Sequence, residues 1–308
     1  MEKLKRIKKN FKKNWFFYLL PLPGLIYMIL FNYAPLAGLY MVFERYTYAG
    51  GLFGSEFVGL ENFRAFFQNS QLVLRALRNT VVLNVLNLVV GTIADVAFAI
   101  VMAEILNKGY KKIVQSVTMF PNFISWIVVG ALSISLFHEQ NGLFNRMLTS
   151  LGADPVAWYS NPWYWWPILI ITTLWKGVGY GSLVHYSALM GVDRGLYEAA
   201  AIDGASRIKR IWYISLPQLT PSILIMFLMG LGNVLRGSME PIMGMTSLNP
   251  TLFETTDTMA VFIYRMAITG GRFETASAMG LLQSIFGMLL VIIANTTVRK
   301  IEPDYSLF

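Results

Sequence analysis

Six long runs of apolar residues, separated by polar segments, dominate the pattern of this 308-residue chain. Each run contains the roughly 20 mostly apolar residues that a helix needs to cross the hydrocarbon core of a membrane. The pattern predicts transmembrane helices at 15–43, 79–106, 113–137, 164–190, 216–240 and 275–298. A further apolar stretch, TMAVFIYRMAI at 258–268, is too short to span and predicts an interfacial or re-entrant helix. We therefore expect an all-α, polytopic membrane protein with six transmembrane helices.

The first apolar run directly follows a basic N-terminus, in which seven of the first thirteen residues are Lys or Arg. A secretory signal peptide also begins with basic residues before an apolar region. This run is longer than such a region, contains no small-residue cleavage site before it turns polar, and is followed by five more runs. We therefore expect an uncleaved first span.

The composition agrees with a membrane protein, because only 14% of the residues are charged where a soluble domain has about 25%. The absence of cysteine excludes disulfides, thiolate catalysis and cysteine-ligated zinc. The formal charge of +8 is compatible with nucleic-acid binding. The placement of the charges argues against it, and we expect no nucleic-acid partner.

Lys and Arg are concentrated in the segments that lie on one side of the predicted membrane. With both termini taken as cytoplasmic, the inner segments contain sixteen of the 25 basic residues. The outer segments and membrane edges contain eight, all of them Arg, while Lys176 lies within a span. Because cytoplasmic loops carry the excess of Lys and Arg, we expect cytoplasmic N- and C-termini.

The cytoplasmic segment between the fourth and fifth spans, EAAAIDGASRIKRIWYISLP at 198–217, has the features of two short helices. Residues 195–203 favour a helix, Gly204 suits the position just after a helix end, and Ser206 can cap a second helix. Pro217 then opens the next span, where its missing N–H is harmless. The pattern predicts a helix–glycine–helix segment, which we call the elbow. One interpretation is an amphipathic anchor on lipid headgroups, held by Arg, Lys and Trp.

The elbow also resembles a known family at fixed spacing. It reproduces the EAA-x2-DGA-x8-I-x-LP pattern of binding-protein-dependent ABC importer permeases without a departure, through Glu198, Ala199, Ala200, Asp203, Gly204, Ala205, Ile214, Leu216 and Pro217. The match covers twenty residues in the expected loop and is highly specific. In that family the elbow is the coupling helix, which docks into a cleft on the cytoplasmic ATPase subunit. The resemblance therefore implies a role for these nine residues in ATPase coupling.

Other segments resemble the sugar-importer permeases, most closely their polysaccharide-permease branch. They include FPNFISWIVVGAL, NGLFNRMLTSLG, WKGVGYGSLVHYSALMGVDRGLYEAA and TTVRKIEPDYSLF, and the resemblance runs from about residue 15 to the C-terminus. Many sugar permeases carry a T-x-GGP-like outer loop where this chain has MGMTSLNPTLFETTDT, so the chain departs from maltose-type permeases. The implied fold is the type I ABC importer (MetI-like) transmembrane fold.

The resemblance implies a transmembrane subunit of a bacterial type I ABC importer for oligosaccharides in the cytoplasmic membrane. Its implied partners are a second, homologous permease forming a heterodimer, an ABC ATPase dimer, an extracellular solute-binding protein and membrane lipids. ATP and Mg would bind at the partner ATPase and not to this chain. The expected organisation is a basic cytoplasmic N-terminus (1–14), a first helix and outer loop (15–75), the importer transmembrane domain (76–298, with the elbow region at 191–217) and a cytoplasmic tail (299–308).

Sequence patterns for catalysis are missing. The chain contains no G-x-x-x-x-G-K-[ST] phosphate loop and no H-E-x-x-H, and His138 and His185 are too isolated to suggest a metal site. No nucleophile–base pair can be argued. We expect no catalytic residues, no bound cofactor and no metal, and hence a chain that is not an enzyme on its own.

Polar residues inside the predicted spans are candidates for a substrate pathway. In the second span Asn84, Asn87, Gly91 and Asp95 recur at helical spacing and form one polar stripe. Asn and Gly also commonly join membrane helices, so helix–helix contact and a pathway lining both remain possible for this stripe.

The fourth and fifth spans contain further candidates. Trp175, Lys176, Tyr180 and Tyr186 combine aromatic surfaces with a charge, and either contact a ligand or pack while Lys176 extends toward the interface. Asn233, Arg236 and Glu240 are predicted to share one helix face, where they would contact sugar hydroxyls or where Arg236 and Glu240 would pair with each other.

Two other classes of protein and one other substrate class remain open. An ion-driven secondary transporter would need repeat symmetry and paired broken helices, which are not visible in the sequence. A membrane-embedded enzyme or scaffold lacks a recognisable catalytic set. Within the ABC class, an importer for peptides or another polar solute is the alternative.

Overall fold

The computed structural model describes residues 14–68 and 70–301, which are mostly helical. The helices are joined by turns and loops and by a two-stranded antiparallel pair, β1 (Glu44–Arg45) with β2 (Glu56–Phe57). Contacts divide the chain into two compact units, one formed by 1–68 with 266–279 and the other by 69–265 with 280–308. The predicted all-α class is confirmed.

Five helical runs in the described part of the chain are long and apolar enough to cross a membrane. They are Asn14–Phe43, Ser70–Glu104, Pro162–Met190, Arg207–Leu231 and Phe273–Lys300. A sixth span is present if Lys108–Phe123 and Trp126–Phe137, which meet at an angle of 96°, are counted together. Counting that bent pair as one span gives the six spans that the sequence predicts.

The third predicted span, 113–137, is wrong as a continuous helix. Here α5 (Lys108–Met119) and η3 (Phe120–Phe123) precede Ile124, which is extended, and α6 (Trp126–Phe137) then starts afresh. Ser125 caps the new helix by accepting a hydrogen bond from the Val128 N–H at 3.4 Å. Because Ser125 caps a new N-terminus, a second helix begins here in a different direction. The apolar character of the run predicts a span but not this break.

In the smaller unit the first span is followed by a short strand pair and a helix. It contains α2 (Leu22–Met28), the π turn η1 (Ile29–Tyr33) and the 3-10 helix η2 (Ala34–Phe43), followed by the strand pair and α3 (Glu61–Gln68). The guanidinium of Arg45 lies 3.0 Å from a carboxylate oxygen of Glu56 and 3.2 Å from one of Glu61. These ion pairs connect the strands to α3.

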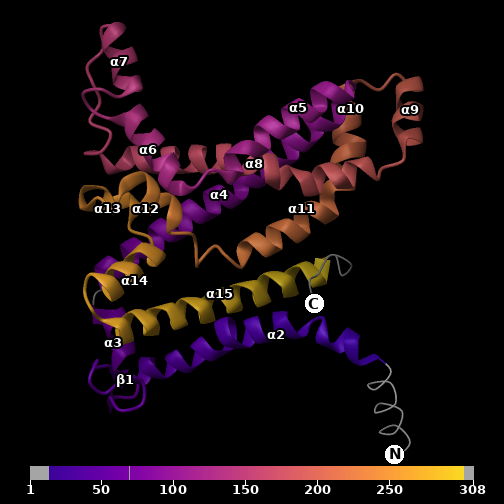
Figure 1. Ribbon diagram of the computed structural model, residues 1–308. Helices are drawn as coiled ribbons and strands as arrows, with labels where there is room; N and C mark the ends of the chain where they lie inside the picture. Colours follow the sequence, from indigo (N-terminus) through magenta and orange to yellow (C-terminus); the bar gives the residue numbers. More distant parts are fainter. Residues whose placement is uncertain (1–13, 69, 302–308) are drawn as a thin grey trace, which may run out of the picture. The chain divides into compact units, whose positions relative to one another are not determined.

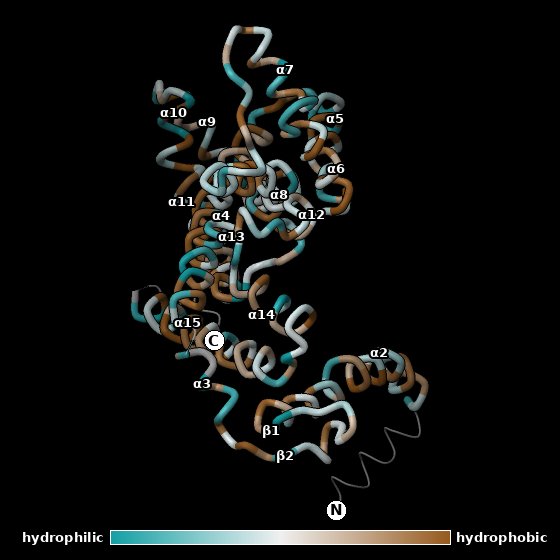
Figure 2. The backbone as a smooth tube through the Cα atoms, turned by 90° about the vertical axis from the view of Figure 1, so that its left-hand side faces the viewer, coloured by the Kyte–Doolittle hydropathy of each residue, from teal (hydrophilic) through white to brown (hydrophobic). Residues whose placement is uncertain are grey.

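The larger unit is built around α4 (Ser70–Glu104) and α8 (Trp165–Met190), which pack along each other (Figure 1). A buried cluster that includes Leu83, Trp165 and Leu169 fills one part of this unit, and Val96, Ala99, Leu189 and Leu219 fill another. Apolar residues dominate α4 and α11 (Leu216–Leu231), whereas hydrophilic residues appear around α9 (Arg194–Ile202) and α10 (Arg207–Arg210) (Figure 2).

Glycines allow the backbones of neighbouring helices in this unit to come close together. A Cβ on Gly179 of α8 would overlap the carbonyl of Thr118 in α5. In the same way Gly130 of α6 lies against the backbone of Gly244 in α12 (Glu240–Thr246). Such small residues are typical of membrane helix interfaces, where backbones come close together.

Two connecting segments of this unit are held by buried polar side chains. Asn145 in α7 (Leu143–Ser150) donates to the carbonyls of Glu139 and Val156 and accepts from the Val156 N–H and the Trp158 indole, at 2.8–3.0 Å. The loop is therefore structured, and it leads into η4 (Pro162–Tyr164).

Asp257 organises the second connecting segment, η6 (Pro250–Leu252), α13 (Phe253–Thr256) and the start of α14 (Met259–Ile268). Its fully buried carboxylate accepts from Arg75 of α4 at 3.0 Å and from Arg265 of α14 at 2.7 Å. α14 itself is short, as the sequence predicts. The last helix, α15 (Phe273–Ile301), follows it.

Candidate functional site

The elbow consists of α9 and α10 joined by a tight turn. Asp193 caps α9, because its side chain accepts a hydrogen bond from the Gly195 N–H at 2.9 Å. α9 contains Glu198, Ala199 and Ala200, and Asp203 is its C-cap residue. The predicted helix followed by a break at Gly204 is therefore confirmed.

Gly204 ends α9 in a left-handed conformation, with φ +76°. The Ala205 N–H donates to the Ala200 carbonyl at 2.9 Å, and the Gly204 N–H donates to the Ala201 carbonyl at 3.1 Å. These two bonds form a Schellman motif, the helix ending in which glycine is favoured. Because no atom lies within 4 Å of where a Cβ would stand on Gly204, a side chain there would be opposed by the backbone conformation rather than by crowding.

The second half of the elbow differs from the prediction. Ser206 caps α10 as expected, accepting from the Lys209 N–H at 3.4 Å. α10 then continues through the π turn η5 (Ile211–Ser215) into α11, so Pro217 lies inside one helical run, Arg207–Leu231, and does not start a separate span. Ile214 lies in this π turn.

The π turn has a local cause in Pro217. A proline within a helix has no N–H to donate, and its ring clashes with the carbonyl four residues earlier. Widening of the preceding turn, seen here as the bond from the Leu216 N–H to the Ile211 carbonyl, makes room for the ring. The same arrangement occurs in the first span, where the π turn Ile29–Tyr33 lies just before Pro35.

A hydrogen bond that the sequence did not predict closes the elbow. The Tyr197 hydroxyl lies 3.0 Å from the hydroxyl of Ser215, which is 5% exposed. It connects α9 to the base of the following helix across eighteen residues. The bond gives α9 a direct link to the residue that precedes α11.

The elbow presents apolar side chains to its surroundings. Ile202, Ile208, Trp212 and Tyr213 are 87%, 68%, 64% and 80% exposed. Ala199 and Ala201 of α9 are exposed as well. Exposed large apolar residues beside small ones form a surface that another protein can approach closely. In α10, Ile208 is exposed and Arg210 is half-buried.

The polar stripe of the second span lies on the part of α4 that contacts other elements. The Asn84 side chain donates to the Val234 carbonyl at 2.7 Å. A Cβ on Gly91 would lie 3.8 Å from Leu174 of α8, and the Asp95 carboxylate lies against Gly181 of the same helix. These three positions thus make helix contacts, whereas the Oδ1 of Asn87 is buried without a hydrogen-bond partner in the described part of the chain.

Lys176 holds the break between α5 and α6. Its ammonium donates to the carbonyls of Pro121 at 3.2 Å and Asn122 at 2.6 Å, and lies 5.4 Å from the centre of the Trp126 ring. The Lys176 ammonium therefore packs against the broken helix, while its extension to the membrane interface and its contact with a ligand stay predictions. Carbonyls released by a broken helix need donors, and a lysine on the neighbouring helix supplies them. Trp175 and Tyr180 of α8 are 45% and 59% exposed, and Tyr186 is half-buried.

The predicted shared helix face of Asn233, Arg236 and Glu240 is also wrong. α11 ends at Leu231, the chain turns through 232–239 with Gly237 at φ +62°, and Glu240 is the first residue of α12. Glycines in the turn and Pro241 at the start of α12 explain why one helix does not continue. Glu240 accepts a hydrogen bond from Ser238. It forms no ion pair with Arg236 among the described residues.

Two of these three residues line a small cavity. The cavity has a volume of about 220 Å³, and Asn233 and Arg236 lie opposite Gln283 and Ser284 of α15. The amide of Gln283 donates to the carbonyls of Leu235 and Arg236. Sequence reasoning missed both α15 residues, although Gln283 and Ser284 are the consecutive polar residues in an otherwise apolar stretch of the last span.

The histidines have structural partners. The Nδ1 of His185, which is 2% exposed, lies 2.9 Å from the Ser222 hydroxyl, and the Nδ1 of His138 accepts from the N–H groups of Gln140 and Asn141 at 3.3 Å. Within residues 14–68 and 70–301, no three His, Cys, Asp or Glu side chains are grouped to hold a metal ion.

Comparison with known proteins identifies the family to which this architecture belongs. A family model described as "Binding-protein-dependent transport system inner membrane component" matches residues 95–306. Protein LplB of Bacillus subtilis (strain 168) is 32% identical over 294 residues, which is 95% of this chain and 91% of the relative. The polygalacturonan/rhamnogalacturonan transport system permease protein YteP of the same organism is 31% identical over 303 residues, or 98% and 94%. The sn-glycerol-3-phosphate transport system permease protein UgpA of Escherichia coli O6:K15:H31 (strain 536 / UPEC) is 30% identical, covering 92% of each chain.

Solved structures agree with these relatives. A chain of a bacterial ABC transporter involved in the import of the acidic polysaccharide alginate superimposes with a TM-score of 0.86 at 32% identity, covering 96% of this chain and 99% of that one. A chain of a bacterial alginate ABC transporter in complex with alginate pentasaccharide-bound periplasmic protein gives 0.85 at 33% identity, covering 96% and 98%. The protein is thus a multi-pass permease subunit with the type I importer fold, and it belongs to the family of binding-protein-dependent transport system inner membrane components.

Proposed function

We propose that this chain is a transmembrane permease subunit of an ATP-driven importer that moves oligosaccharides across the bacterial cytoplasmic membrane. The observation that carries the proposal is the exposed elbow, which contains the nine motif residues and a Schellman-closed turn and continues into the membrane-length run Arg207–Leu231. The named substrates of two similar proteins, polygalacturonan/rhamnogalacturonan and alginate, support an oligosaccharide.

Coupling to a separate ATPase is the role proposed for the elbow. The exposed Ile202 and Ile208 and the small alanines of α9 offer a surface for a cleft on the ATPase. Closure of the ATPase dimer around ATP and Mg²⁺ would pull α9, and the Tyr197–Ser215 bond would transmit the pull to α11. The importer would then open outward to receive sugar, and ATP hydrolysis would restore the inward-facing state.

The remaining partners follow from the same proposal. A second, homologous permease would complete the pathway as a heterodimer, and an extracellular solute-binding protein would deliver the sugar. The first span suits contact with lipid or with a second permease, because almost all of its side chains are exposed in this chain. The distribution of Lys and Arg supports cytoplasmic termini.

An importer for another polar solute is the second candidate. It is favoured by the 30% identity to a permease for sn-glycerol-3-phosphate over 92% of each chain. The two candidates differ in the ligand of the cognate solute-binding protein. A calorimetric screen of that protein should detect binding of oligosaccharides and none of glycerol phosphate or peptides.

Transport itself is tested in proteoliposomes. Vesicles that contain both permeases and the ATPase should accumulate the oligosaccharide when ATP and the loaded binding protein are supplied. Vesicles that lack the ATPase should not. Uptake driven by an ion gradient in vesicles without the ATPase would replace the proposal with a secondary transporter.

The cavity between the 232–236 turn and α15 is the proposed point of sugar contact in this chain. Asn233, Arg236, Gln283 and Ser284 offer donors and acceptors of the kind that bind hydroxyls. Replacing Arg236 with Ala should lower oligosaccharide uptake while leaving assembly and basal ATP hydrolysis unchanged. Because Arg236 is exposed and has no described ion-pair partner, its loss leaves no buried charge behind. An unassembled complex would show that Arg236 is structural instead.

A further inference from the structure

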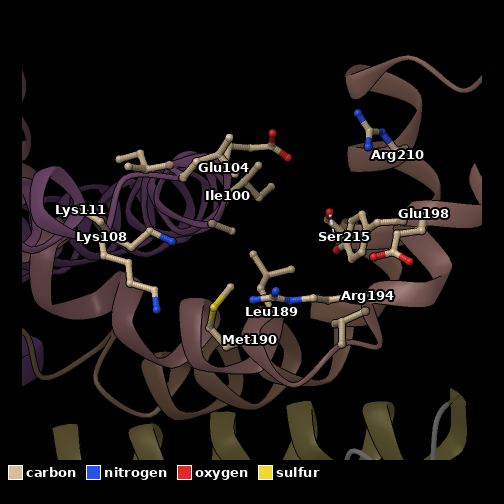
Figure 3. Close-up of a pocket in the computed structure, with 15 residues that line it drawn as sticks. Ile100, Glu104, Lys108, Lys111, Leu189, Met190, Arg194, Glu198, Arg210 and Ser215 are labelled. Atoms are coloured by element: carbon tan, nitrogen blue, oxygen red, sulfur yellow. Dashed lines mark hydrogen bonds between the residues drawn. The ribbon is translucent and has the colours of Figure 1, made fainter. Parts of the chain in front are cut away.

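A cavity beside the elbow is not used by the transport proposal. It has a volume of about 500 Å³ and lies where the spans Ser70–Glu104 and Pro162–Met190 end. Its walls come from the end of α4, the start of α5, the end of α8 and the two halves of the elbow (Figure 3). Because the cavity lies at the ends of two spans, we expect it at the level of the membrane–water interface.

Positive side chains surround this cavity from two sides. Lys108 and Lys111 approach from α5, while Arg194 and Arg210 approach from the elbow (Figure 3). Glu104 and Glu198 are the acidic residues of the lining, which leaves a formal excess of two positive charges. Across the described ranges none of the four cations forms an ion pair within 4.0 Å.

One of these cations has an orphaned donor. The Nε of Arg210 is buried and makes no hydrogen bond within the described part of the chain. A buried donor of a charged group without an acceptor is costly, so an acceptor supplied from outside the chain would be stabilising. The oxygens of a phosphate group are strong acceptors for Arg.

Apolar residues complete the lining. Ile100 of α4 and Leu189 and Met190 of α8 form part of the wall, and Leu106, 93% exposed, lies in the same lining. A cavity that joins an apolar wall to a cationic one fits an amphipathic anion. Basic pockets between helices at the membrane surface are suited to anionic lipid headgroups.

We propose that this cavity binds the phosphate group of an anionic phospholipid, with the acyl chains along Ile100 and Leu189. The phosphate would lie between the lysines of α5 and the arginines of the elbow. A lipid in this position would touch the helix that carries Glu198, the first residue of the family motif, and so restrain α9. Binding of the lipid is separable from transport, because it can be measured without sugar or ATP.

The test compares the wild-type permease with two double variants by native mass spectrometry in detergent with added phosphatidylglycerol. Lys108→Gln with Lys111→Gln removes two positive charges from the cavity. Lys112→Gln with Lys209→Gln removes two exposed lysines that do not line it. The cavity variant should bind the lipid at least roughly tenfold more weakly, whereas the control should match wild type. Equal binding by the two variants would overturn the proposal.

Further experiments with the wild-type protein alone distinguish a lipid phosphate from free inorganic phosphate. Phosphatidylcholine should bind much more weakly than phosphatidylglycerol, and millimolar inorganic phosphate should leave the bound phosphatidylglycerol in place. Displacement by inorganic phosphate would show a site for the free anion and contradict a lipid site. Displacement by the added ATPase subunit would assign the cavity to the protein interface and also contradict it.

Discussion

Lys176 shows at the scale of one residue how a charge inside a span can serve structure. Its two hydrogen bonds satisfy carbonyls in the break between α5 and α6. Replacing Lys176 with Met should lower the thermal midpoint of the purified permease, because each bond to a charged group contributes about 1.5–3 kcal/mol.

The control for this variant is Lys112→Met, which alters an exposed lysine and should leave the midpoint unchanged. A Lys176→Met protein with wild-type stability and no sugar uptake would place Lys176 in the substrate pathway instead. Fluorescence-detected unfolding in detergent measures the first property, and uptake in vesicles measures the second.

The structural roles of single residues were predictable where the local backbone conformation favours one residue type. Gly204 and Ser206 hold the positions that their chemistry favours, a left-handed helix end and a helix cap, so the sequence predicted both. The partner of Lys176 lies on another helix more than fifty residues away, and no local pattern encodes such a contact. The role of Gln283 was not predicted either, because the carbonyls that it contacts belong to the distant 235–236 turn.

At the scale of elements, length and hydropathy predicted where spans occur better than where they bend or end. The run 113–137 is apolar throughout, yet Pro121 and the Ser125 cap accompany a 96° bend within it. The run 216–240 contains three glycines that permit the turn after Leu231. Apolar length reports compatibility with lipid, while caps, glycines and prolines decide the path of the backbone.

The outer segment around α13 depends on one buried carboxylate. Asp257 contacts Arg75 and Arg265, so Asp257→Asn would leave two guanidinium groups without their shared charge. The expected loss of stability is about 3–5 kcal/mol, the range for breaking a buried ion pair. Thermal unfolding of the detergent-solubilised permease measures it.

Glu254→Gln is the matched control for this element. Glu254 pairs with Arg78 at 2.9 Å, but the carboxylate is 44% exposed, and exposed pairs contribute about 0–1 kcal/mol. If Asp257→Asn and Glu254→Gln lowered the thermal midpoint equally, the claim that Asp257 stabilises this segment more than an exposed ion pair does would be wrong.

For the whole molecule, the proposed orientation in the membrane rests on the distribution of Lys and Arg. The chain contains no cysteine, so single cysteines report their own positions without background. Cysteine at exposed Lys209 or Lys112 should be protected from a membrane-impermeant thiol reagent in intact cells, and cysteine at exposed Asn141 should react. Labelling of Lys209→Cys from outside would reverse the proposed topology.

The central claim is that the elbow transmits the state of an ATPase to the membrane helices, and Gly204→Val tests it most directly. Valine at φ +76° strains the turn by about 1–3 kcal/mol, while the open space around Gly204 avoids a clash that would prevent folding. Lys209→Gln, on exposed α10, removes a charge and leaves the turn intact. A lipid-headgroup anchor would depend on the lysine and tolerate the valine.

The decisive measurement is ATP hydrolysis by the complete transporter in nanodiscs, with and without the sugar-loaded binding protein. We predict that Gly204→Val assembles but loses stimulation, whereas Lys209→Gln keeps most of it. Wild-type stimulation in Gly204→Val, or a greater loss in Lys209→Gln, would contradict a coupling role for the elbow.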